Sequence, residues 1–95
     1  MRVDAIEEAA GRATAGRLAA AAIASPQGQS RRVAVLGPAP APIARLRGRY
    51  RFRVLLRSAD RSALRGALAA VDAARRAERD RNVRVALDVD PVSML

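Results

Sequence analysis

The sequence contains no cysteine, no histidine and no lysine, and its only aromatic residues are Tyr50 and Phe52. Without cysteine, disulfides and thiolate metal sites are excluded, and a reducing cytoplasm fits the chain. Without histidine, the commonest general base and the commonest metal ligand are missing. The few serines have no adjacent base to activate them as nucleophiles. We therefore expect a protein that is not an enzyme and that holds no metal or other cofactor.

The sequence also lacks an apolar run long enough to span a membrane. The apolar run from Leu18 to Ala24 is short, and Ser25 follows it. Acidic residues near the N-terminus, with Arg17 just before the run, argue against a secretory signal. We interpret this run as part of a helix and expect no membrane partner.

All 18 basic residues are arginine, and the formal net charge is +9. Eight of them lie between Arg31 and Arg57, where there is no acidic residue, so this block carries +8. A GC-rich genome explains the use of arginine over lysine without any physical reason. The placement of the charge is more informative, because a basic block in an otherwise balanced domain suits a polyanion. The alternative is a solvated strand face whose charges discourage edge pairing.

The basic block contains a stretch from Arg45 to Arg57 that alternates between arginine and apolar residues. Successive side chains of a strand point to opposite faces, so this pattern predicts a strand with one arginine face and one apolar face. The arginine face holds Arg49, Arg51, Arg53 and Arg57, and the apolar face holds Tyr50, Phe52, Val54 and Leu56. Both aromatic residues are therefore expected in the core, which disfavours base stacking on them.

The remaining elements follow from periodicity and from turn residues. A helix capped by Asp4 ends at Ser25, and a second, capped by Ser58 or Asp60, runs to Arg76. Short strands are expected over residues 32–36 and 82–90, with a proline-stiffened connector over residues 38–42. The fold class is therefore α+β: one domain over residues 1–95, with a three-stranded sheet backed by two helices on one face, in the order αββαβ.

Asp88 and Asp90 lie two residues apart on one face of the last predicted strand. This spacing is compatible with a metal, but no third ligand is evident. We expect these aspartates to pair with arginines on the same sheet face.

Three stretches of the sequence are distinctive: Val35-Leu36-Gly37-Pro38-Ala39-Pro40-Ala41-Pro42, Arg47-Gly48-Arg49-Tyr50-Arg51-Phe52 and Leu87-Asp88-Val89-Asp90-Pro91. Together they resemble the C-terminal domain of the PriA-type primosomal replication-restart DNA helicase. Their order and spacing match the end of that family, over roughly residue 31 to the terminus. The resemblance implies a compact βαββαβ unit.

The sequence departs from that family in two respects. It has no GxxxxGK[ST] motif and no cysteine, so the ATPase motor and the zinc-binding insert of the helicase are absent from this chain. The family domain also begins with a strand, whereas this chain is expected to start at the first helix. We therefore expect a fragment whose sheet lacks its first strand, an interior one.

The resemblance implies a non-catalytic domain that engages forked or single-stranded DNA. The predicted contacts are Arg45, Arg47, Arg49, Arg51, Arg53 and Arg57. The alternative function is a protein-interaction module for the acidic tail of single-stranded-DNA-binding protein. For that partner the resemblance suggests Arg61, at the start of the second helix, although a solvent-exposed arginine in a first helical turn explains this position slightly better. A ribosomal-protein-like role in RNA binding remains open on charge alone.

Overall fold

The computed structural model describes residues 1–46, 48–78 and 82–86 of the chain. Its elements form a βαββαβ order with one additional short helix. They are β1 (Arg2–Ala5), α1 (Glu8–Ala24), α2 (Pro26–Gln29), β2 (Ala34–Leu46), β3 (Arg49–Arg57), α3 (Arg61–Arg76) and β4 (Val83–Ala86). The resemblance had implied this order of strands and long helices.

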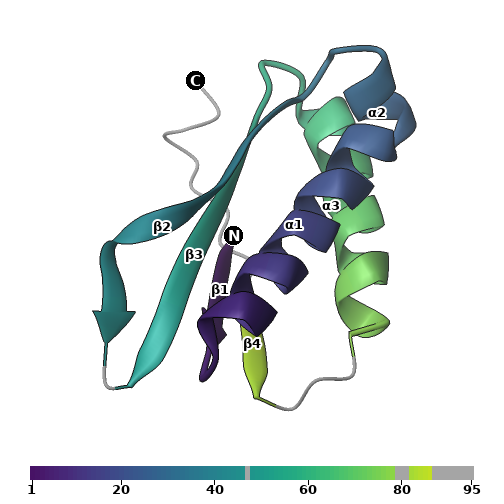
Figure 1. Ribbon diagram of the computed structural model, residues 1–95. Coiled ribbons are helices and arrows are strands. Elements are labelled where there is room, and N and C mark those ends of the chain that lie inside the picture. Colours follow the sequence, from purple (N-terminus) through teal and green to yellow (C-terminus); the bar gives the residue numbers. More distant parts are fainter. Residues whose placement is uncertain (47, 79–81, 87–95) are drawn as a thin grey trace.

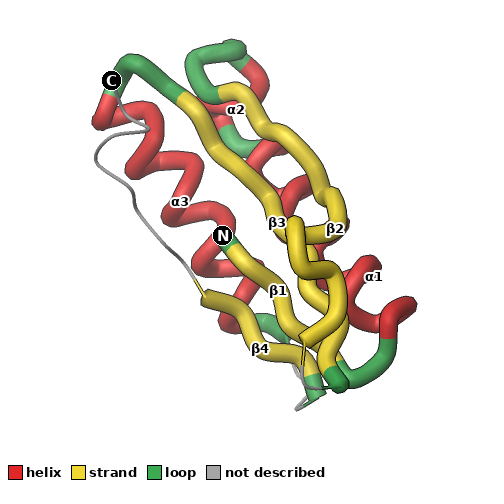
Figure 2. The backbone as a smooth tube through the Cα atoms, turned by 90° about the vertical axis from the view of Figure 1, so that its left-hand side faces the viewer, coloured by secondary structure: helices red, strands yellow, loops and turns green. Residues whose placement is uncertain are grey.

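The four strands form one antiparallel sheet in the order β2-β3-β1-β4. The helices α1 and α3 lie side by side against one face of this sheet, and α2 continues from the end of α1 (Figure 1). Seen after a quarter turn, the strands lie in front of the helices, and no described helix covers their outer face (Figure 2). The described residues therefore form two layers, and among them one face of the sheet is packed and the other is open.

The predicted three-stranded sheet is wrong, because a fourth strand, β1, lies between β3 and β4. The first strand is therefore present, and it is interior as the family pattern implied. Val3 and Ala5 of β1 are fully buried against the helices, whereas Asp4 lies on the opposite face. Asp4 therefore does not cap α1, whose N-cap is Glu7 with no side-chain hydrogen bond. The sheet is therefore complete with four strands of this one chain.

The predicted connector over residues 38–42 is also part of a strand. The strand β2 runs from Ala34 through all three prolines to Leu46, paired on one side with β3. Because β2 is the edge of the sheet, a proline there can lack its N–H without losing a ladder bond. Register shifts after Leu36 and after Pro40 accommodate the irregular stretch.

The predicted end of the first helix, the cap of the second long helix and the last strand are confirmed. The first helix ends before Ser25, and Asp60 caps α3 by accepting hydrogen bonds from the N–H groups of Ser62 and Ala63. The last strand is present as β4, and its predicted continuation past Ala86 lies outside the described residues. Within the described residues, no helix combines the length and apolarity needed to cross a bilayer.

The core lies between the sheet and the two long helices. Its largest fully buried side chains include Leu18 of α1, Val3 of β1, Val54 of β3 and Val71 of α3. Phe52 is also buried, and Tyr50 packs against the same cluster. The apolar face of β3 therefore points inward as the alternation predicted, and the arginine face of the same strand is left on the open side.

Candidate nucleic-acid interface

The open side of the sheet carries arginines on three adjacent strands. Directly opposite residues of paired strands share a face, so the register places these side chains together. We call this surface the arginine face; its members are Arg2 of β1, Arg49, Arg51, Arg53 and Arg57 of β3, and Arg84 of β4. Arg49, Arg51 and Arg53 are about 6–7 Å apart along β3, Arg57 lies two such steps beyond Arg53, and adjacent strands are about 4.8 Å apart.

One carboxylate lies within the arginine face. The Asp4 Oδ1 atom is 3.3 Å from Arg2 Nε and 3.6 Å from Arg51 Nε. Arg84 of β4 is the cross-strand partner of Asp4 on its other side. The side chains of Asp4 and Arg51 are 18% and 21% exposed, so this ion pair is substantially shielded from solvent. The centre of the arginine face is therefore partly neutralised.

Three of the four remaining arginines of the face are freer, whereas Arg49 is only partly exposed. Arg53, Arg57 and Arg84 are exposed, and within the described part of the chain none of them forms an ion pair. Arg53 lies opposite Ala39, and Arg57 lies opposite Ala34, so small side chains flank them on β2. Their guanidinium groups are accessible to an anion from the open side of the sheet.

The predicted site residues divide into three groups. Arg49, Arg51, Arg53 and Arg57 are brought onto one surface, as the alternation indicated. Arg45 lies in β2 opposite Tyr50, whereas the arginines of β3 occupy the alternate positions. Arg47 lies outside the described residues. The contacts predicted for Arg45 and Arg47 remain predictions.

Sequence reasoning missed Arg2 and Arg84 as members of this surface, and missed Asp4 at its centre. The available signal was the alternation in β1, where Arg2 and Asp4 flank the buried Val3. Two residues on each face are too few to distinguish a strand from the start of a capped helix. Arg84 alternates with the apolar residues Val83 and Val85 in β4, but only the pairing of β4 with β1 brings it next to Asp4.

Arg61 lies apart from this surface, at the first position of α3, where it is exposed. The N-terminus of this helix already has an acceptor, because the Asp60 carboxylate caps it. Arg32 Nη2 in turn lies 3.1 Å from Asp60 Oδ2. The N–H groups of residues 62 and 63 are therefore not free to bind the carboxylates of an acidic peptide. At this helix end, such a peptide would contact the guanidinium of Arg61 alone.

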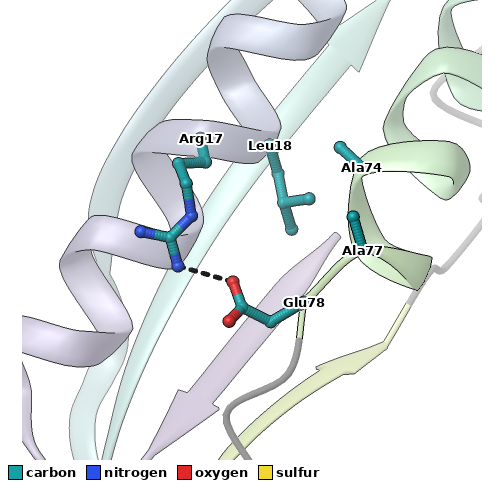
Figure 3. A pocket seen from close by; sticks show the side chains of 5 residues that line it. All are labelled: Arg17, Leu18, Ala74, Ala77 and Glu78. Carbon is teal, nitrogen blue, oxygen red and sulfur yellow. Dashed lines mark hydrogen bonds and ion pairs between the residues drawn. The ribbon is translucent and has the colours of Figure 1, made fainter.

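A cleft on the helical side is occupied by an ion pair. It lies between α1 and α3 and is lined by Arg17, Leu18, Ala74, Ala77 and Glu78. Figure 3 shows the guanidinium of Arg17 and the carboxylate of Glu78 pointing toward each other. Arg17 Nη2 donates to Glu78 Oε2 at 2.5 Å and to Thr14 Oγ1 at 2.9 Å. Thr14 Oγ1 also lies 3.2 Å from Glu78 Oε2 and donates to it. The polar groups of this cleft satisfy one another, which favours a structural role.

Clusters of acidic residues that would hold a metal are absent from the described ranges. The predicted pairing of Asp88 and Asp90 with arginines lies outside these ranges.

The fold and the surface together define a class of protein: a small α+β domain of βαββαβ order that presents a basic sheet face. The model of the primosomal protein N C-terminal domain family matches residues 1–92, which is nearly the whole chain. The chain therefore belongs to the primosomal protein N C-terminal domain family, and its role is in the primosome and in replication restart. A search of curated proteins gave no match.

Proposed function

We propose that the chain is the non-catalytic DNA-binding domain of a PriA-type helicase and engages single-stranded or forked DNA through its arginine face, in the cytoplasm. The observation that carries the proposal is the location of six arginines on the one sheet face that no described helix covers. Membership of the primosomal family supplies a context in which the polyanion is DNA.

The geometry of β3 favours an extended strand of nucleic acid. Arg49, Arg51 and Arg53 recur every second residue, about 6–7 Å apart, which is close to the phosphate spacing of an extended single strand, and Arg57 lies two steps further on. Guanidinium groups bind phosphate oxygens through a planar fork of donors. Contacts of this type carry charge but no base sequence, so binding is selective for structure and sensitive to salt.

The test is fluorescence anisotropy of the chain with labelled single-stranded, duplex and forked DNA over a salt series. Four phosphate contacts on a single strand give a log–log salt slope of roughly −2.8, from about −0.7 per contact. We expect tighter binding to single-stranded or forked DNA than to duplex. Equal and weak binding to all three would contradict the proposal and would leave the arginine face as a solvated surface.

Two double variants distinguish DNA binding through the arginine face from DNA binding through the net charge of the chain. In Arg53→Gln/Arg57→Gln, two exposed arginines of the face are neutralised, and the slope should become shallower by about 1.4. The matched control is Arg65→Gln/Arg76→Gln, which removes the same charge from α3 on the helical side. Equal losses in the two variants would indicate that overall charge, and not this surface, controls binding.

A second proposal concerns the acidic tail of single-stranded-DNA-binding protein, with Arg61 as its contact. The exposure of Arg61 at the start of α3 is its only support. The N-terminus of the helix adds nothing to it, because the Asp60 carboxylate already accepts a hydrogen bond from an N–H group there. Arg61→Ala should weaken binding of a labelled acidic tail peptide and leave DNA affinity nearly unchanged. Arg65→Ala, one turn further along α3, is the control; an equal effect of both would leave Arg61 without a specific role.

A further inference from the structure

Two exposed leucines interrupt the basic surface at the point where β3 breaks its arginine repeat. Leu55 occupies the position between Arg53 and Arg57 on the open face. Its direct cross-strand partner is Leu36 of β2, and each leucine is 45% exposed. Side chains directly opposite on antiparallel strands lie about 5 Å apart, so the pair forms one apolar spot. We call it the leucine pair.

The backbone next to the leucine pair is fixed in an irregular shape. Four residues of β2, from Leu36 to Ala39, lie opposite only three of β3, from Leu55 to Arg53, so β2 contains a bulge. Gly37 in the bulge has φ +105°, and a Cβ there would lie 2.6 Å from the carbonyl oxygen of Arg53. The bulge therefore requires glycine and brings β2 close to Arg53 beside the exposed leucines.

From this juxtaposition we infer that the leucine pair is a contact for an unpaired nucleobase, next to phosphates held by Arg53 and Arg57. This inference rests on the function proposed above. A ligand that fits this surface must carry anionic groups at strand spacing and an apolar group between them. An unstacked single strand has both, because its bases are splayed away from a phosphate backbone. A duplex hides its base faces within the stack.

The aromatic residues cannot take this role. Phe52 is only 3% exposed, and it points to the helical side together with Tyr50. Four large apolar side chains of the described residues are substantially exposed: Leu36 and Leu55 lie in strands, whereas Ile6 follows β1 and Ile23 lies on α1. Burying the two leucines against a base removes apolar surface from water, which supplies binding energy that phosphate contacts alone do not. The leucine pair thus gives the arginine face its preference for single strands over duplex.

The experiment compares two labelled strands of equal length and equal phosphate number: an oligodeoxythymidylate and an abasic strand. A leucine contact with a base is weaker than aromatic stacking, so we expect a preference of about fivefold for the strand with bases. Equal affinity of the wild-type chain for both strands would overturn the inference while leaving phosphate binding intact. Failure to bind either strand would overturn the proposed function as well.

Two variants test the residues themselves. Leu36→Thr/Leu55→Thr should abolish the preference for bases and leave abasic binding and the salt slope unchanged, because threonine retains strand propensity. Leu55→Arg should reduce the preference while steepening the slope by about 0.7, because it completes the arginine repeat. Ile23→Thr is the control, since Ile23 is 50% exposed but lies on α1. A preference that survives both leucine variants would contradict the inference.

A second copy of the chain is the other occupant that the experiment can reveal. Sedimentation of the wild type and of Leu36→Thr/Leu55→Thr measures this directly. A dimer that the double variant abolishes, together with equal affinity for the two strands, would show that the leucine pair is a self-association surface and would overturn the inference.

Discussion

The carboxylate of Asp4 lies 3.6 Å from the guanidinium Nε of Arg51, on the neighbouring strand and directly opposite in register. The same Oδ1 atom lies 3.3 Å from Arg2 Nε. A single acidic residue therefore engages two of the six arginines on the open sheet face. A phosphate that approaches the centre of this face must compete with Asp4 for the same donors. The proposed DNA contacts are then strongest at Arg53 and Arg57, away from this carboxylate.

Asp4→Asn should tighten DNA binding, because it releases Arg2 and Arg51 and removes a negative charge from the path of the phosphates. Two additional contacts would steepen the single-strand salt slope by up to about 1.4. We expect an affinity gain of about fivefold at low salt. Anisotropy over a salt series measures both quantities.

The control for Asp4→Asn is Glu8→Gln, which makes the same change in net charge on α1. Glu8 pairs with Arg12 in an exposed i,i+4 ion pair on the helical side. Its loss should leave the salt slope unchanged. Weaker binding by Asp4→Asn would instead mean that the carboxylate orients Arg51 for the phosphate.

Replacing Gly11 or Gly16 of α1 by alanine should change the stability of the fold in opposite directions. A Cβ on Gly11 would lie 2.8 Å from Ala5 Cβ and 2.9 Å from the Phe52 ring, so Gly11→Ala should destabilise the fold by about 1–3 kcal/mol. A Cβ on Gly16 meets nothing within 4 Å, so Gly16→Ala should stabilise the helix by roughly 0.5–1 kcal/mol. Thermal melts followed by circular dichroism compare the two. Similar shifts of both variants would contradict the close approach of α1 to the sheet at Gly11.

Asp72 makes the stability of α3 depend on pH. Hydrogen bonds from Arg75, with help from the charge of Arg76, lower the pKa of the Asp72 carboxyl below its ordinary value of 3.8. The unfolded chain therefore binds a proton at Asp72 more readily than the folded chain does. The stabilisation of the fold by ionised Asp72 is present above about pH 4 and is lost as the pH falls through the pKa of the folded state. Asp72→Asn should melt below the wild type at pH 7, and the difference should be smaller at pH 3. A constant difference at both pH values would show that the charge of Asp72 is not involved.

The parts of the fold that could be predicted from the sequence are those with long, regular patterns. The alternation of arginine and apolar residues in β3 predicted both faces correctly, and Asp60 marked the start of α3. The strand β1 was missed because only Val3 and Ala5 mark its inner face, and Asp4 is equally typical of a helix cap. The prolines of β2 were interpreted as a connector because an edge position, which tolerates them, depends on the whole sheet.

The candidate site was predictable along one strand but not across strands. The four arginines of β3 could be placed on one surface from their spacing alone. Arg2, Asp4 and Arg84 join them only through pairing between distant segments, which a local pattern does not encode. The leucine pair has the same origin, because Leu36 and Leu55 meet through the register of β2 against β3. Long-range register is therefore the information that sequence reasoning lacked.

The buried hydroxyl of Thr14 should couple energetically to Glu78. Thr14 interrupts the apolar stripe of α1, and the structure explains why: it is 1% exposed and donates to Glu78 Oε2, which also accepts from Arg17. Thr14→Val and Glu78→Gln should each lower the free energy of unfolding by about 1–2 kcal/mol. Each weakens the charge-assisted hydrogen bond between Thr14 of α1 and Glu78, which lies two residues past the end of α3. In a double-mutant cycle the combined loss should be smaller than the sum, since both variants break the same contact. Urea unfolding of the four proteins measures the coupling. Strict additivity would mean that the hydroxyl and the carboxylate act independently, and the network would not fix the end of α3 against α1.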